Sequence, residues 1–304
     1  MHDSVLEAIE KGDGAFGATL AELHAVACGL KAWVVERVSN GIETCRRLCG
    51  SHGFAQSSNL AHLFAESVGA NTYEGTSDVL VQQHARYLLK TLASPPVNER
   101  SLKFLNQVKH YNDDQLHCKA ESITDFDNLD LLVEAFRTRA ARIVMSLARR
   151  MDATKNDSNA CMVLMTRAST AHSELILLEA FIDKVSNFRS GPEKNSVTQL
   201  CSLFGAWLIT KALGDFRQHD YISSAQAVLL QEQVAHLLSV TRKNCVLLTD
   251  AWDFRDFELN SAIGRYDGDI YRALVKCTAD EPLNKMQVPE GYEMFVKPLI
   301  QSGL

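Results

Sequence analysis

One carboxylate, Glu74, lies in a short polar segment just before a strongly helical stretch. Residues 71–78 read NTYEGTSD, and Thr76, Ser77 and Asp78 can each cap a helix predicted over residues 79–92. Backbone N–H groups at a helix N-terminus point outward and favour anions, phosphate groups included. Glu74 is therefore a candidate general base beside a candidate anion site. The alternative is that it only complements the helix dipole.

Glycines punctuate a second candidate segment, residues 49–54, which read CGSHGF. Glycine lets a backbone approach a ligand such as a pyrophosphate closely, and it also shapes tight turns. Gly50 and Gly53 are therefore either ligand contacts or turn residues. A third motif, QHARYL at residues 83–88, lies inside the predicted helix over residues 79–92.

The bulk composition excludes several classes of protein. The chain has 304 residues, 46% of them hydrophobic, and a net charge of −6, so it is long enough for a sizeable core and its overall field does not attract nucleic acid. Its apolar runs stay below the roughly 18–20 residues that cross a bilayer, so we expect no membrane span. Its first residues, MHDS, lack a basic region followed by an apolar core, so we expect no secretion.

The eight cysteines have no C-x-x-C spacing, which predicts buried free thiols in a reducing compartment. No metal site is predicted. Cys45 and Cys49 share a helix face without further ligands nearby. Glu232 and His236 are one residue too far apart for the Glu-x-x-His motif of a di-iron bundle, and a surface pair is the simpler interpretation.

Apolar residues recur at helical spacing, prolines are only six, and no alternating strand pattern is convincing, so the predicted fold class is all-α. Leu20, Leu23, Ala27, Leu30 and Val34 form one apolar stripe, and the Ser-Asn-Gly sequence at residues 39–41 is expected to interrupt that helix. Helices are predicted over residues 20–38, 42–48, 57–68, 79–92, 102–109, 129–147, 160–186, 197–213, 223–246, 257–263, 270–277 and 292–299.

Two adjacent prolines, Pro95 and Pro96, cannot continue a helix and mark the best linker. The predicted domains are residues 1–94, a linker region over residues 95–125, and residues 126–304. On the long helix of the last domain we expect the arginines to form a solvated face rather than a nucleic-acid or CoA contact. We expect four aromatic residues to pack in the core or the end of the bundle. The arginines are Arg137, Arg139, Arg142, Arg149 and Arg150, and the aromatics are Phe204, Trp207, Trp252 and Phe254.

Taken together, the motifs CGSHGF, TYEG and QHARYL, in this order and spacing, resemble the carboxyl-terminal half of a peroxisomal acyl-CoA oxidase. LAELHA at residues 20–25, GRYDGD at 264–269 and PLNK at 282–285 extend the resemblance over nearly the whole chain. The resemblance implies two packed helical bundles, similar to part of the catalytic helical domain and to the C-terminal helical domain of that family.

The resemblance further implies an FAD enzyme that oxidises fatty acyl-CoA to trans-2-enoyl-CoA and passes the electrons to O2, giving H2O2. Glu74 matches the base that removes the proton α to the thioester. Gly75, Thr76 and Asp78 match residues that line the flavin. Gly50 and Gly53 belong to a turn whose first part, residues 47–51, matches a segment that reaches the FAD of a neighbouring subunit in a homodimer. Ser51 stands where the family usually has a second glycine.

The family's subunit also has a helical domain and a β domain before this region. We therefore expect that the chain alone does not retain stoichiometric FAD. The last residues, Ser302, Gly303 and Leu304, stand where the family carries a Ser-Lys-Leu address, so the resemblance implies the peroxisome, with the cytoplasm otherwise. Two alternatives stay open. One is an inactive helical relative that acts as a binding or assembly partner, and the other is an acyl-CoA dehydrogenase that passes electrons to a protein acceptor.

Overall fold

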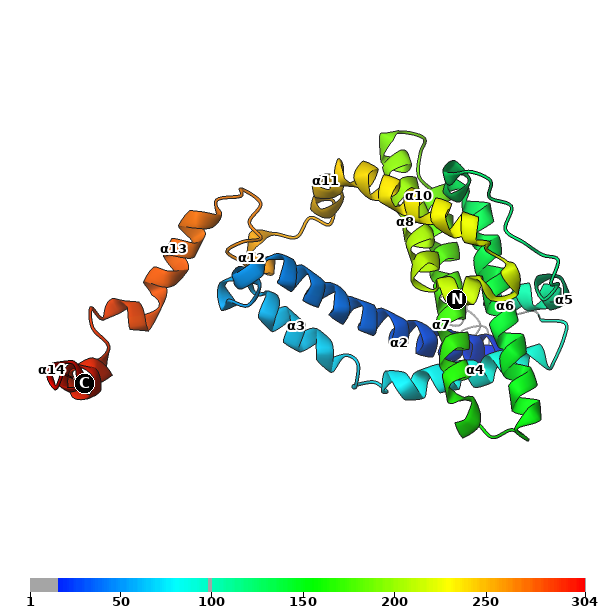
Figure 1. Cartoon of the computed structure of the whole chain (residues 1–304), viewed down its shortest axis with the longest axis horizontal. Helices are drawn as coiled ribbons and strands as arrows, with labels where there is room; N and C mark the ends of the chain where they lie inside the picture. The colour runs from blue at the N-terminus through cyan, green and yellow to red at the C-terminus, as the bar shows by residue number, and fades with distance from the viewer. Residues whose placement is uncertain (1–15, 98–99, 304) are drawn as a thin grey trace. The chain divides into compact units, whose positions relative to one another are not determined.

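The computed structural model describes residues 16–97 and 100–303, and these residues form helices and connecting turns without a strand (Figure 1). The all-α fold class is therefore confirmed. The α-helices are α2 Phe16–Leu48, α3 Leu60–Gly69, α4 Ser77–Leu92, α5 Val108–Tyr111, α6 Leu129–Ala153, α7 Met162–Ser186, α8 Pro192–Lys211, α9 Leu213–Phe216, α10 Ser224–Arg242, α11 Cys245–Asp250, α12 Asp256–Leu259, α13 Ile270–Asp280 and α14 Lys297–Gln301. The 3₁₀ helices are η1 Gly50–Gly53, η2 Gln56–Ser58, η3 Arg100–Gln107, η4 Ile123–Asp127, η5 Asn159–Cys161, η6 Gln218–Asp220 and η7 Pro282–Lys285, and η8 Tyr292–Val296 is a π-helix.

The chain divides into two compact units. The first comprises Met1–Glu36 and Asn71–Ala251, and the second comprises Arg37–Ala70 and Trp252–Leu304. The division into residues 1–94, 95–125 and 126–304 stays a prediction, because compactness groups the residues by a different criterion.

A helical bundle forms the core of the first unit, where α6 packs on α7, α8 packs on α10, and α4 packs on α7 (Figure 1). An apolar stripe of α6 lies inside this bundle. Its members Leu132, Phe136, Ala140, Val144 and Leu147 are fully buried. Asn128 begins the helix, because its side-chain oxygen accepts hydrogen bonds from the backbone N–H groups of the first turn. The local sequence thus sets both the start of α6 and its buried face.

The expected solvated arginine face was wrong for two members, because Arg139 and Arg142 point into the bundle and are buried. Arg142 donates from Nε to the Tyr111 carbonyl at 2.9 Å and from Nη2 to the Asp113 carbonyl at 2.9 Å. Its guanidinium also binds the carbonyls of Leu116 and Gln218. A buried cation is tolerated here because backbone oxygens satisfy its donors. Arg142 thereby fastens the long connections around α6 to the bundle.

Arg139 is instead neutralised by two acids from other helices. It forms ion pairs with Glu174 of α7 and, at 2.9 Å, with Asp215 of α9. Asp215 also pairs with Arg167 at 2.6 Å, and Glu174 accepts a 3.0 Å hydrogen bond from the indole N–H of Trp33. The network therefore connects side chains of four helices, α2, α6, α7 and α9.

A chain of hydrogen bonds links two fully buried histidines between α4 and α7. His172 Nε2 donates to the Ser101 carbonyl at 2.9 Å, since a carbonyl can only accept. His172 Nδ1 then accepts from His84 Nε2 at 2.9 Å, and His84 Nδ1 accepts from the Ser169 hydroxyl at 2.9 Å. Both imidazoles are therefore assigned as neutral Nε2–H tautomers. Burial lowers the pKa of His172 to about 4, and burial together with His172 lowers the pKa of His84 well below its usual range.

We expect this pair to make the protein acid-sensitive. In the unfolded chain both imidazoles take up protons near pH 6.5. The folded chain does not protonate His172 until about pH 4. The unfolded state therefore binds more protons in this window, so the contribution is complete above about pH 6.5 and is lost as the pH falls towards 4. For His172 the loss is about 3 kcal/mol in the free energy of unfolding.

Urea unfolding measured between pH 7.5 and pH 4.5 tests this prediction. His172→Gln keeps a donor for the Ser101 carbonyl but removes one titrating group, so its stability should depend less on pH than that of the wild type. His236→Gln alters an exposed histidine of α10 and serves as the control. An unchanged pH dependence in His172→Gln contradicts the assignment.

Two expectations for α2 were wrong. The helix continues through Gly41 to Leu48, because a glycine costs an interior helical turn only about 1 kcal/mol and no proline blocks it. The residues of the predicted apolar stripe are exposed or half-buried, while small residues form the buried face. That face includes Ala25, Cys28 and Ala32. Gly29 shows why small residues are needed on this face, because a Cβ there would lie 2.0 Å from His84 Nδ1. The close approach of α2 and α4 requires small side chains, and a search for large apolar residues does not detect such a face.

Other burial expectations hold only in part. All eight cysteines are free, but Cys45, Cys49, Cys245 and Cys277 are exposed rather than buried. Phe204 and Trp207 pack against the core as predicted. Trp252 and Phe254, by contrast, are 75% and 63% exposed. An aromatic residue type alone therefore does not predict whether its side chain packs against the core.

Within the part of the chain that the structure describes, one helical segment, Gly17–Leu48, has the length and composition of a membrane span, with a window of mean hydropathy 1.3. Core helices of soluble proteins meet the same criterion. The buried face of this helix includes the carboxylate of Glu22, which accepts hydrogen bonds from the backbone N–H and the hydroxyl of Ser101. Only 33% of that window is buried, so packing covers part of its apolar surface, and the absence of a membrane span stays a prediction.

Candidate functional site

Glu74 lies in the connection between α3 and α4, two residues before the N-cap of α4. Its backbone is left-handed, with φ 57°, and Gly75 follows with φ 102°. Thr76 then returns to extended geometry as the N-cap, although its side chain makes no capping hydrogen bond. Asp78 lies in the first turn of α4. The structure therefore brings Glu74, Gly75, Thr76 and Asp78 together at one helix N-terminus.

Gly75 is required at its position for two reasons. Its positive φ is unfavourable for residues with a side chain, and an added Cβ would lie 3.0 Å from Leu80 Cδ2. Leu80 is itself buried in a small cluster with Cys28 and Ala32 of α2. The segment 71–77 is also closed by a 3.4 Å hydrogen bond from the Ser77 N–H to the Asn71 carbonyl. The loop that carries Glu74 is thus fitted against the α2–α4 contact.

The carboxylate of Glu74 is exposed in this chain. Its loop is held from α2 by Lys31, whose ammonium donates to the carbonyl of Tyr73 at 2.9 Å and to that of Gly75 at 2.6 Å. Sequence reasoning missed Lys31. Lysine is common on helix surfaces, and Lys31 lies 42 residues from Tyr73, so no local pattern connects them.

The glycine turn belongs to the second compact unit, whereas Glu74 belongs to the first. Gly53 is buried, and a Cβ on it would lie 1.8 Å from the Arg46 carbonyl oxygen. Close packing on the last turns of α2 therefore accounts for Gly53. Gly50 has φ +59° and open space around it. Its left-handed turn accounts for a glycine, and the cofactor role of both residues stays a prediction.

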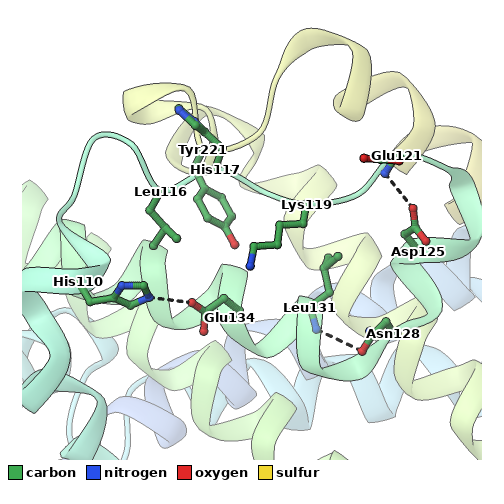
Figure 2. Close-up of a pocket in the computed structure, with 10 residues that line it drawn as sticks. All are labelled: His110, Leu116, His117, Lys119, Glu121, Asp125, Asn128, Leu131, Glu134 and Tyr221. Atoms are coloured by element: carbon green, nitrogen blue, oxygen red, sulfur yellow. Dashed lines mark hydrogen bonds and ion pairs between the residues drawn. The ribbon is translucent and has the colours of Figure 1, made fainter.

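Cavities elsewhere in the first unit include two that Glu74 does not line. One, of about 680 Å³, lies beside Glu22, Ser101, Arg137 and Glu179. The other, of about 520 Å³, is shown in Figure 2, where Lys119 and the hydroxyl of Tyr221 point into the cavity and His110 approaches Glu134 at 3.3 Å. Its lining mixes both signs of charge. Among the described residues, no group of three or more His, Cys, Asp or Glu side chains is arranged to hold a metal ion.

Family comparisons cover nearly the whole chain. Residues 128–301 match the family described as acyl-CoA oxidase, and residues 1–89 match the acyl-CoA oxidase C-alpha1 domain. Glu74, Gly50 and Gly53 fall within the second match, and the bundle built on α6, α7, α8 and α10 falls within the first.

Individual relatives agree with the family match. Peroxisomal acyl-coenzyme A oxidase 1 of Arabidopsis thaliana is 36% identical over 296 residues, which are 94% of this chain and 44% of the relative. The structure of Arabidopsis thaliana acyl-CoA oxidase 1 matches with a TM-score of 0.92 and 35% identity, over 98% of this chain and 46% of that one.

A third relative, the acyl-CoA oxidase-1 of Caenorhabditis elegans in complex with FAD and ATP, matches with a TM-score of 0.88 and 26% identity. That match covers 99% of this chain and 46% of that one. The chain thus spans less than half the length of these relatives. A family match over more than half of the chain, together with a matching helical architecture, shows that the chain belongs to the acyl-CoA oxidase family.

Proposed function

We propose that this chain supplies the catalytic base and part of the flavin site of a peroxisomal acyl-CoA oxidase. The reaction is oxidation of a fatty acyl-CoA to trans-2-enoyl-CoA, with the electrons passing to O2 to give H2O2. The main support for this proposal is the position of Glu74 in the loop before α4. A single carboxylate lies on a left-handed loop at the N-terminus of α4, within the family match.

Glu74 acts in this proposal as the base that takes the α-proton of the thioester. Left-handed backbone at a residue other than glycine costs on the order of 1–3 kcal/mol, and at an active site such geometry can hold a side chain in a required direction. The loop also places the Gly75 N–H immediately after the carboxylate, where it can donate to the thioester carbonyl as enolate character develops. Because Glu74 is exposed in this chain, the bound acyl chain must exclude water from it.

The residues at the start of α4 fit a flavin. Gly75, Thr76 and Asp78 surround a helix N-terminus, whose backbone N–H groups favour anionic and polar ligand atoms. The Ser77 hydroxyl there is buried and makes no hydrogen bond within the described residues, so it is available to a polar ligand atom. When bound, FAD would accept the β-hydride and pass the electrons to O2.

The second part of the flavin site is assigned to the turn containing Gly50 and Gly53, acting on the FAD of the other subunit of a homodimer. The support is the family match over residues 1–89, together with the C. elegans relative that was crystallised with FAD. Peroxisomal location rests on the relatives that carry that description.

A chimera tests the proposal. Its amino-terminal part is taken from the Arabidopsis oxidase, and this chain replaces the matching carboxyl-terminal region. We expect the chimera to retain flavin absorbance through gel filtration and to release peroxide when given palmitoyl-CoA. A chimera that binds FAD but is reoxidised only by an electron-transfer flavoprotein would favour the dehydrogenase alternative. One that binds FAD without any acyl-CoA oxidation would favour an assembly partner.

A further inference from the structure

We propose that Lys31 is a positioning residue for Glu74. Its ammonium binds the backbone carbonyls of the residues before and after Glu74, Tyr73 and Gly75, and we call this pair of hydrogen bonds the clamp. An effect of Lys31 on catalysis rests on the proposed function, whereas its hydrogen bonds to the loop do not.

The two hydrogen bonds of Lys31 bracket a single residue. The ammonium donates to the carbonyl of Tyr73, which precedes Glu74, at 2.9 Å, and to the carbonyl of Gly75, which follows it, at 2.6 Å. Both bonds have a charged donor, and such bonds are about twice as strong as neutral ones. Rotation of the Glu74 backbone would turn at least one carbonyl away. The clamp therefore restricts the direction in which the Glu74 side chain leaves the loop.

The loop geometry explains why a cation is needed there. Successive left-handed residues, with φ 57° at Glu74 and 102° at Gly75, bring the two carbonyl oxygens onto one atom of Lys31. Oxygens that converge in this way carry partial negative charges and repel each other unless a donor lies between them. Lys31 supplies that donor and offsets part of the backbone strain of Glu74.

Helix packing gives Lys31 its position. It lies on α2 between Cys28 and Ala32, and both of these pack against Leu80 of α4. Two residues before Lys31, Gly29 allows α2 to approach His84 of α4, where a Cβ would lie 2.0 Å from Nδ1. The α2–α4 crossing is therefore fixed on both sides of Lys31, and its ammonium is carried to the loop by rigid elements rather than by another loop.

Amide hydrogen exchange on the full 304-residue chain tests the clamp directly. The Ser77 N–H, bonded to the Asn71 carbonyl, and the Val79 and Leu80 N–H groups, bonded to the Thr76 carbonyl, report whether the loop is closed. Lys31→Met keeps the apolar stem but removes the donors, and it should accelerate exchange of these amides by about tenfold or more. Lys31→Arg restores a charged donor and should recover most of the protection.

Lys90→Met is the control, because Lys90 is an exposed lysine near the other end of α4, the helix that carries the reporter amides. It should leave exchange at residues 77–80 unchanged. Unaltered exchange in Lys31→Met, or equal acceleration in Lys90→Met, overturns the proposal.

Turnover separates this inference from the proposed function. In the active chimera, Lys31→Met should lower kcat by about tenfold or more while the KM for acyl-CoA changes little, because a misplaced base weakens the chemical step rather than binding. Lys31→Arg should recover kcat. If Glu74 proves dispensable for turnover, the proposed function fails, yet the exchange experiment still decides whether Lys31 holds the loop.

Discussion

Replacing Glu74 with glutamine is expected to lower the acyl-CoA-dependent release of peroxide by roughly 10³-fold, because positioned general bases typically contribute 10²–10⁴-fold to a rate. Glutamine has nearly the same shape and cannot accept the α-proton. Because glutamine keeps the size of the side chain and the rest of the loop is unchanged, flavin content and the free energy of unfolding should stay close to those of the wild type. The measurement is steady-state kcat in the flavin-loaded chimera.

Glu36→Gln provides the matched control, since Glu36 is an exposed carboxylate of the first unit on α2. It should retain full turnover. Retention of kcat in Glu74→Gln would reject Glu74 as the base. A loss of flavin together with kcat would show that the substitution disturbs the site rather than the proton transfer.

Replacing Arg139 with methionine is expected to destabilise the chain by about 3–5 kcal/mol, because it leaves a buried charge network without its central cation. The Arg139 and Glu174 side chains are only 4% and 2% exposed, so water cannot replace the lost partner. Asp215 retains Arg167, so most of the loss should come from Glu174. Urea unfolding at neutral pH, with the free energy extrapolated to water, measures the effect.

Arg150→Met is the control for this prediction, because Arg150 is exposed on the same helix and its loss should change the free energy of unfolding by no more than about 0.5 kcal/mol. Adding Glu174→Gln to Arg139→Met should recover part of the stability by removing the unpaired carboxylate. If Arg139→Met is as stable as Arg150→Met, the network does not contribute to folding.

The arginines show which part of the fold a sequence leaves open. Helical periodicity predicted a helix over residues 129–147, where the structure has α6, because that signal is local. The same reasoning assigned Arg139 and Arg142 to solvent, because a charge is normally expelled from a core. Their partners are distant in sequence, with Glu174 separated from Arg139 by 35 residues and Gln218 from Arg142 by 76. Only folding brings those partners close enough to stabilise the buried charges.

For the candidate site, local sequence patterns were enough to predict the all-α class, the helix that follows Glu74 and the acid, glycine and N-cap at its start. These properties depend on residues within a few positions of one another. The tertiary structure decided the buried face of α2, the left-handed geometry of Glu74 and the clamp from Lys31. These depend on how closely α2 and α4 cross, and that distance is set by Gly29 and small neighbours meeting a buried histidine. Glu74 can thus be recognised as a candidate base from its sequence neighbours. Lys31, which orients its loop, lies on α2, and only the packing of α2 on α4 brings it close to the loop.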